Sequence, residues 1–273
     1  MENDKKKLLP EIPVVILCGG QGTRMRAVSE ELPKPMVDVG GKPILWHIMK
    51  SYSHYGVKRF ILALGYKGDR IVDYFENYYK HTHDYTMRVM HEEPQRYPIS
   101  SKDEDSDIDE WEITFAYTGE YTMTGGRIKR VEKYINTPSF FATYGDGISN
   151  VDIRKLYEFH CGHGRIATLT GVHLPTTFGV VETDAGGSVI SFREKPVMPG
   201  LINGGFFVFN HEIFSLIKGD STILEAEPFY QLVEQQEIRV WKHDGFWHCM
   251  DHYKDYSDLN KMWKENNAAW KVW

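Results

Sequence analysis

A glycine-rich segment near the start of the chain has the residue types that bind phosphate. It reads Leu17-Cys18-Gly19-Gly20-Gln21-Gly22-Thr23-Arg24 and follows a short apolar run. Three glycines let the backbone turn tightly and present N–H groups to an anion. The Thr23 hydroxyl and the Arg24 guanidinium add donors that match phosphate oxygens. A simple turn between a strand and a helix would by itself explain two of the glycines.

Two common phosphate-binding motifs do not fit this segment. A P-loop ends in Gly-Lys followed by Ser or Thr, whereas this segment ends in Gly-Thr-Arg. A dinucleotide fingerprint needs a third glycine or alanine where this chain has Met25, and no acidic residue ends a strand about 20 residues later. The spacing therefore argues against both a P-loop NTPase and a nicotinamide dehydrogenase.

Two charged residues further along are candidates for the same site. Lys34 lies between Pro33 and Pro35, whose fixed φ angles hold the lysine at a defined reach from the glycine turn. Asp146 follows an apolar run within Gly145-Asp146-Gly147. An acid there can lie at the C-terminal edge of a sheet, where open α/β folds bind ligands. As an isolated residue, Asp146 could equally cap its own turn.

The elements that must position these residues alternate between strand and helix through the first two-thirds of the chain. This alternation predicts a mostly parallel sheet with helices on both faces. Strands are predicted over 14–18, 58–64, 87–91, 113–117, 140–144 and 166–172, and helices over 43–55, 69–79, 127–135 and 151–160. The acidic stretch Pro94–Asp109 is expected to be a surface loop or a partner contact.

The last third changes character. Two runs joined by Asp184-Ala185-Gly186-Gly187 predict a hairpin over 178–194, and 204–210 and 253–265 predict a further strand and a C-terminal helix. We therefore expect a single domain over 1–273. Its residues 1–175 form a Rossmann-like core, and 176–273 form a smaller β-containing part.

The composition excludes several classes of protein. A net charge of −6 provides no field to attract nucleic acid, and no apolar run approaches the length that spans a bilayer. The three cysteines are few and widely spaced, which favours a reducing cytoplasm over a disulfide framework. We expect no signal peptide. The twelve histidines form no HExxH motif or Cys/His cluster, and so they indicate no zinc site.

The glycine turn followed by Lys34-Pro35-Met36 resembles the signature of the sugar nucleotidyltransferases, a family with a GT-A-like fold. That family joins a nucleoside triphosphate to a sugar 1-phosphate and releases pyrophosphate. Longer blocks resemble one branch, the glucose-1-phosphate cytidylyltransferases. The blocks are residues 40–50, 123–131, 143–147, 202–208, 245–247 and 270–273.

The resemblance implies a reaction between CTP and α-D-glucose 1-phosphate that gives CDP-glucose, a precursor of surface polysaccharide. It implies catalytic roles for Arg24, Lys34 and Asp146, and a Mg²⁺ ion on Asp146 and Asp251, a set that suits this ion. Implied nucleotide contacts are Leu17 to Arg24, Lys34, Thr122, Arg127 and Gly145. Glu194, Lys195, Asn203 and Gly204 would bind the sugar phosphate. A homo-oligomer is also implied, with residues 1–175 as the nucleotide-binding part and 176–273 as the part for sugar-phosphate binding and oligomerisation.

The chain departs from the branch near the second metal ligand. His248, Cys249 and His252 stand where the branch has Gln, Pro and Thr. Another nucleotide (UTP or dTTP) or another phosphorylated acceptor therefore stays open. A non-catalytic relative that only binds a sugar nucleotide is disfavoured because Lys34, Asp146 and Asp251 are present. Aromatic residues are candidates for subunit contacts, namely Trp46, Trp263, Trp270 and Trp273.

Overall fold

The computed structural model describes residues 9–20, 32–78, 80, 111–176 and 178–273, together with the backbone of 85–88 and 95–98. The strands are β1 (Val14–Leu17), β2 (Asp38–Val39), β3 (Lys42–Pro43), β4 (Arg59–Leu64), β5 (Tyr85–Arg88), β6 (Gln95–Pro98), β7 (Glu112–Tyr117), β8 (Ser139–Tyr144), β9 (Gly147–Ser149), β10 (Ala167–Val172), β11 (Val180–Thr183), β12 (Val189–Arg193), β13 (Ile202–Asn203), β14 (Phe207–Asn210), β15 (Ile238–His243) and β16 (Trp247–Cys249). The helices are α3 (Ile44–His54), α4 (Gly68–Glu76), α6 (Thr124–Val131), α7 (Ile153–His163), α8 (Glu227–Glu234) and α9 (Tyr253–Lys264).

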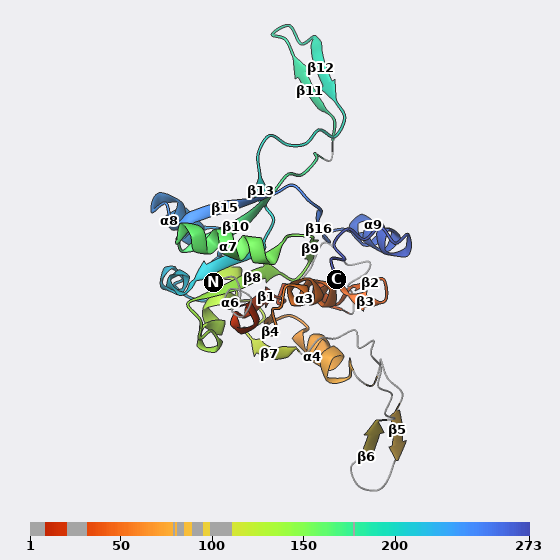
Figure 1. Ribbon diagram of the computed structural model, residues 1–273. Coiled ribbons are helices and arrows are strands. Elements are labelled where there is room, and N and C mark those ends of the chain that lie inside the picture. Colours follow the sequence, from red (N-terminus) through yellow and green to blue (C-terminus); the bar gives the residue numbers. More distant parts are fainter. Residues whose placement is uncertain are drawn as a thin grey trace.

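A mixed, mostly parallel sheet forms the centre of the molecule (Figure 1). Its order is β13-β10-β14-β8-β1-β4-β7, and β15 pairs with β10 in parallel over Ala167–Val172. The strands β8, β1, β4 and β7 are mutually parallel, whereas β14 runs antiparallel to both β8 and β10. The predicted α/β fold is confirmed.

Helices cover both faces of this sheet, because its central strands are apolar on both sides. In β1, Val15 belongs to one buried cluster and Ile16 to the other. In β8, Phe140 and Phe141 divide in the same way. Strands buried on both faces have continuous apolar runs, which is the pattern of the β1 sequence.

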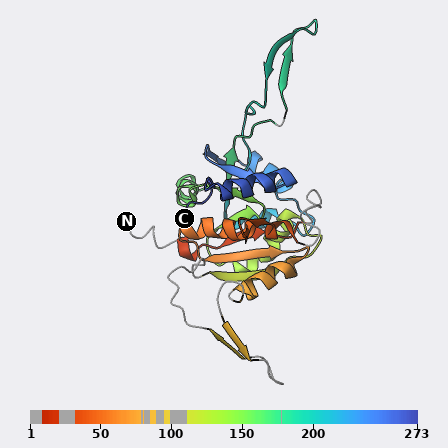
Figure 2. The same ribbon diagram turned by 90° about the vertical axis from the view of Figure 1, so that its right-hand side faces the viewer.

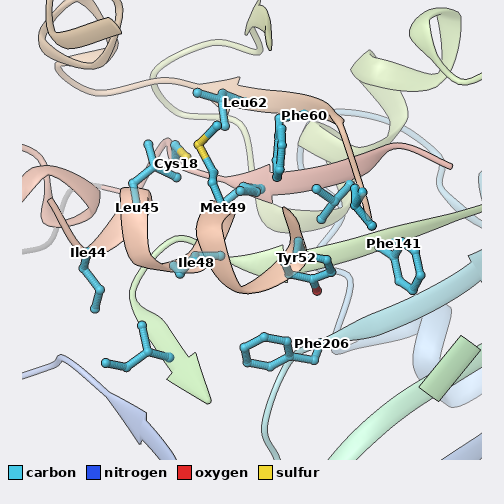
Figure 3. Close-up of a cluster of buried hydrophobic side chains, with 14 of the residues drawn as sticks. Cys18, Ile44, Leu45, Ile48, Met49, Tyr52, Phe60, Leu62, Phe141 and Phe206 are labelled. Carbon is cyan, nitrogen blue, oxygen red and sulfur yellow. The ribbon is translucent and has the colours of Figure 1, made fainter. Parts of the chain in front are cut away.

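On one face, α3 lies against the sheet through its apolar side (Figure 3). The Tyr52 ring packs 5.7 Å from Phe141 and 5.9 Å from Phe206, measured between ring centroids. On the opposite face the second cluster includes Ile128 of α6 and Leu232 of α8. The core thus holds β1 and β8 rigidly at the edge where the site is found.

Two hairpins project from this body in Figures 1 and 2. One is β11–β12, as the sequence predicts. The other, β5–β6, was not predicted as a hairpin. The strand expected at 87–91 is instead Tyr85–Arg88, and it pairs with Gln95–Pro98 from within the expected loop rather than joining the sheet. The remainder of the loop up to Asp109 lies outside the described residues.

The C-terminal aromatic residues form an internal cluster. Trp270 is 1% exposed and Trp46 is 3% exposed. The His47 ring lies between them, with centroids 5.1 Å from Trp46, 4.9 Å from Trp263 and 6.1 Å from Trp270. Trp273 packs edge-on to Trp46. The expectation that these tryptophans supply subunit contacts is wrong for Trp46 and Trp270, because their side chains are buried within the chain, where they pack the C-terminal segment against α3.

Other elements were missed or misplaced by the sequence interpretation. Strands β9, β13, β15 and β16 and helix α8 were not predicted. The helix expected at 127–135 begins at Thr124 and ends at Val131. In the described part of the chain, no helix is long and apolar enough to cross a membrane.

Candidate active site

A pocket of about 300 Å³ opens at the carboxyl edge of the sheet, where β1 and β8 end beside each other with Leu17 opposite Tyr144. Among the described residues, nine of those proposed from the sequence line it, together with Pro35, Met123, Thr124 and Tyr144. The nine are Leu17, Cys18, Gly19, Gly20, Lys34, Thr122, Arg127, Gly145 and Asp146. The chain brings these residues together from four separate segments.

Lys34 lies between two carboxylates. It begins a short 3₁₀ turn (Lys34–Met36) with Pro35 in its first positions. Its Nζ lies 3.3 Å from Asp146 Oδ2 and donates a second hydrogen bond to Asp251 Oδ1. Burial alone would lower the pKa of Lys34, but the two carboxylates together raise it. Lys34 is therefore firmly protonated in this arrangement.

The two carboxylates are held in register by backbone pairing. In the β9–β16 ladder Cys249 pairs with Gly147, and the Met250 N–H donates to the Asp146 carbonyl at 2.8 Å. Burial raises the pKa of Asp146, and Lys34 opposes that shift. The ladder therefore fixes Asp251 beside Asp146 although the residues are far apart in the sequence.

Asp255 fixes the backbone of Asp251. Its Oδ2 accepts the Asp251 N–H at 2.9 Å and the His252 N–H at 2.7 Å, and its Oδ1 lies 3.2 Å from His248 Nε2. Sequence reasoning missed this role. The geometry is that of a capping box at the start of α9, but His252 and Asp255 stand in place of the Ser or Thr and the Glu or Gln of the sequence signature, so the sequence carried little signal.

Arg127 lines the pocket and donates hydrogen bonds to the backbone around it. Its side chain is buried, and its guanidinium donates to the carbonyls of Gly19 (3.0 Å), Leu64 (3.1 Å) and Gly119 (2.7 Å) and to the Thr118 hydroxyl (2.7 Å). Burial lowers the pKa of Arg127. Arg127 thus ties the glycine turn to the ends of β4 and β7.

The proposed sugar contacts Asn203 and Gly204 lie where β13 ends, ahead of β14. Asn203 Nδ2 donates to Tyr144 Oη at 3.0 Å, and Trp247 Nε1 donates to the Gly204 carbonyl at 2.7 Å. Gly205 adopts a φ of +73°, which favours glycine, and the backbone stays bound to β10 because the Gly204 N–H donates to the Thr170 carbonyl at 2.8 Å and the Thr170 N–H donates to the Gly205 carbonyl at 3.2 Å. Asn203 thereby contacts Tyr144, which lines the pocket and was not proposed from the sequence.

Two other proposed residues, Glu194 and Lys195, do not line this pocket, and four lie outside the described part of the chain. Glu194 and Lys195 follow β12 in the stem of the projecting hairpin. Their side chains are about 60% exposed and form an ion pair 3.7 Å long with each other. Gln21, Gly22, Thr23 and Arg24 lie outside the described residues. The roles proposed for all six stay predictions.

The donor set at Asp146 and Asp251 suits a hard cation that keeps most of its ligands from phosphate or water. Among the described residues, no group of three or more His, Cys, Asp or Glu side chains is arranged to hold a metal by protein ligands alone. Both carboxylates already share one cation, the Lys34 ammonium. The site therefore fits a metal that arrives with a phosphate ligand.

Comparison with known proteins gives concordant results. The family model described as nucleotidyl transferase matches residues 13–262. A glucose-1-phosphate cytidylyltransferase of Salmonella typhi is 45% identical over 261 residues, which cover 95% of this chain and 98% of that protein. A probable glucose-1-phosphate cytidylyltransferase of Bacillus subtilis is 42% identical over 95% of this chain and 99% of that protein. Among solved structures, HddC from Yersinia pseudotuberculosis superposes with a TM-score of 0.66 and 26% identity over 92% of this chain and 99% of that one.

Proposed function

The chain belongs to the nucleotidyl transferase family, and we propose that it transfers a cytidylyl group from CTP to α-D-glucose 1-phosphate, giving CDP-glucose and pyrophosphate. The observation that carries this proposal is the identity of 45% and 42%, over nearly the whole chain, with relatives that bear this activity in their names. The grouping of Lys34, Asp146 and Asp251 at the pocket supports it, because a non-catalytic binding protein has no need of that grouping.

The proposed reaction is a direct in-line displacement. An oxygen of the sugar 1-phosphate attacks the α-phosphorus of CTP, and the bond from that phosphorus to the bridging oxygen breaks, so that the electron pair leaves with pyrophosphate. The attacking phosphate is ionised at neutral pH, and no general base is required. The protein's contribution is positioning and neutralisation of charge.

In this proposal the glycine turn, Arg24 and Lys34 hold the triphosphate, and Thr122 contacts the nucleoside. Arg127 keeps the turn in shape and places a positive charge in the pocket wall. Family members use a divalent metal, and we propose Mg²⁺ on Asp146 and Asp251. When bound, the metal would neutralise phosphate charge. Lys195 would hold the sugar phosphate, which requires the hairpin stem to approach the pocket.

We also propose a cytoplasmic homo-oligomer. The cysteines of the described residues are all free thiols, which suits a reducing compartment.

The β11–β12 hairpin exposes Phe178, Val181, Ile190 and Phe192 by 51% to 78%. A projecting two-stranded hairpin with apolar side chains in water is expected to pack against another surface, and we assign a second copy of the chain. Light scattering should give a multiple of the monomer mass, and Phe192→Asp should reduce it; a monomeric wild type would refute this assignment.

The test of the activity is pyrophosphate release. The purified protein is mixed with Mg²⁺ and glucose 1-phosphate, and CTP, UTP, dTTP, ATP and GTP are offered in parallel. Release with CTP alone supports the cytidylyl reading, whereas release with another nucleotide keeps the chemistry and overturns the choice of base. No release with any nucleotide refutes glucose 1-phosphate as the acceptor. Asp146→Asn is the control for contaminating activity.

A further inference from the structure

A carboxylate that the reaction described above does not use lies behind the wall of the pocket. Glu225 Oε2 accepts a hydrogen bond from Thr124 Oγ1 at 2.7 Å, and its Oε1 accepts one from Tyr144 Oη at 2.5 Å. Both partners line the pocket. Thr124 opens α6 on the nucleotide side, and Tyr144 ends β8 next to Asn203 on the sugar side. Glu225 therefore joins the two sides.

The glycine pair at the start of α6 admits the segment that carries Glu225. A Cβ on Gly126 would lie 2.5 Å from the Asp220 carbonyl oxygen, and one on Gly125 would lie 2.8 Å from the Thr222 carbonyl oxygen. The Met123 and Gly126 N–H groups donate to these same two carbonyls at 2.8 and 3.2 Å. Only glycine permits this approach, so the pair is explained by packing that delivers Glu225.

The hydrogen bonds fix the direction of every proton in this network. The Gly205 N–H donates to Asn203 Oδ1 at 3.0 Å, so the amide nitrogen of Asn203 must face Tyr144 Oη. Tyr144 consequently accepts from Asn203 and donates its own proton to Glu225. Burial and, second, the Glu225 carboxylate raise the pKa of Tyr144, so its hydroxyl stays protonated.

The two ends of the network depend on Glu225 to different degrees. The Thr124 hydroxyl also accepts the Leu224 N–H at 2.9 Å, and this backbone anchor remains if the carboxylate is removed. Among the described residues, Tyr144 Oη forms hydrogen bonds with Glu225 and Asn203 alone. Loss of Glu225 is therefore expected to affect Tyr144 and Asn203 more than Thr124.

We propose that Glu225 is a positioning residue for the sugar phosphate. Glu225 orients Tyr144, and through Tyr144 it orients the Asn203 amide. This rests on the proposed function, in which Asn203 meets the sugar hydroxyls. An amide locked in one orientation presents its remaining N–H and its remaining carbonyl lone pair in fixed directions. Glu225 thus prepares the pocket for a polyhydroxylated phosphate.

The test is a comparison of KM values for the two substrates in four variants. Glu225→Ala and Tyr144→Phe should each raise the KM for glucose 1-phosphate about 10-fold, the effect of losing one buried hydrogen bond, and change the KM for CTP by less than about threefold. Glu225→Gln should recover most of the sugar affinity, because its amide oxygen can accept from Tyr144 while its NH₂ donates to Thr124. The matched control is Glu227→Ala, which removes an exposed carboxylate paired with Lys218.

The outcomes separate this proposal from the reaction itself. Equal changes in both KM values, or a change in melting temperature alone, would overturn the role of Glu225. So would a Glu225→Gln variant as impaired as Glu225→Ala, since charge rather than orientation would then matter. If Glu225→Ala does not fold, Tyr144→Phe carries the test. A wild type inactive with glucose 1-phosphate refutes the proposed acceptor instead, and the same variants are then compared by calorimetric Kd for glucose 1-phosphate and CTP.

Discussion

Replacement of Lys34 by methionine tests the centre of the site. Methionine keeps much of the length of lysine and removes its charge, so that Asp146 and Asp251 lose the cation they share. Unit charges 3.3 Å apart attract by about 5 kcal/mol at an effective dielectric constant of about 20. The Lys34 side chain is 13% exposed and that of Asp146 is 25% exposed, so solvent screening and desolvation reduce the net loss of stability to about 2 kcal/mol.

Three measurements follow from this change. The melting temperature should fall by about 4 to 8 °C, as expected for a loss of this size in a chain of this length. The kcat/KM for CTP should fall by about 10²- to 10³-fold, because the cation proposed to hold the triphosphate is lost. In contrast, Mn²⁺ binding to the nucleotide-free protein, followed by electron paramagnetic resonance, should tighten by about 10-fold because the ammonium no longer competes for the carboxylates.

The two expected effects have opposite signs, since kcat/KM falls while the affinity for Mn²⁺ rises. Weaker catalysis together with tighter metal binding is expected only if Lys34 occupies the carboxylates until a nucleotide arrives. Lys218→Met is the control, since Lys218 pairs with Glu227 at the surface and should change neither quantity. A Lys34→Met variant with wild-type kcat/KM, or with weaker Mn²⁺ binding, would refute the reasoning.

Three further predictions concern the structure around the site. Burial lowers the pKa of His47 to about 4, so that as the pH falls His47 is protonated in the unfolded chain before it is protonated in the folded chain. The free energy of unfolding should therefore fall by about 2 kcal/mol between pH 7 and pH 5, and urea unfolding should show a flatter pH dependence in His47→Gln. Arg127→Met strands the Gly19 carbonyl and its neighbours, and should lower the unfolding free energy by about 3 kcal/mol and weaken CTP binding in calorimetry; an unchanged CTP affinity would argue against its role in shaping the turn. Gly126→Ala should displace the segment at Asp220 and raise the KM for the sugar phosphate in the same direction as Glu225→Ala; a wild-type KM would contradict the packing argument.

The residues most easily found from the sequence are those whose chemistry is local. The glycine turn, Lys34 between two prolines and Asp146 in its turn each stand out within a few positions. The residues that were missed act through partners remote in sequence. Tyr144 has the form of an ordinary strand aromatic until Glu225 is placed beside it, 81 residues later. Asp255 was missed because His252 and Asp255 lack the residue types of the capping-box signature. The β9–β16 ladder was missed because strands of three residues leave no periodic pattern to detect.

The glycine pair Gly125 and Gly126 belongs to a block that the sequence comparison recognised without explaining why glycine is needed there. The resemblance places the pair beside Arg127, an expected nucleotide contact, whereas the structure shows these glycines facing the segment around Asp220 and Thr222. Likewise Arg127 was expected to contact the nucleotide, and its donors are directed largely at backbone carbonyls. Spacing identifies a conformational requirement, but it does not name the atom that imposes it.

The sequence by itself determined the alternation of strands and helices and the apolar run that becomes β1, and it predicted a phosphate-binding turn, because these depend on neighbours within one or two turns of chain. The tertiary structure decided which charges meet. Lys34 and Asp251 are 217 residues apart and share a hydrogen bond only because the β9–β16 ladder carries Asp251 back to the edge of the sheet. Coulombic and hydrogen-bond energies fall off within a few ångströms, so a site built from distant segments exists only once the sheet has set those distances.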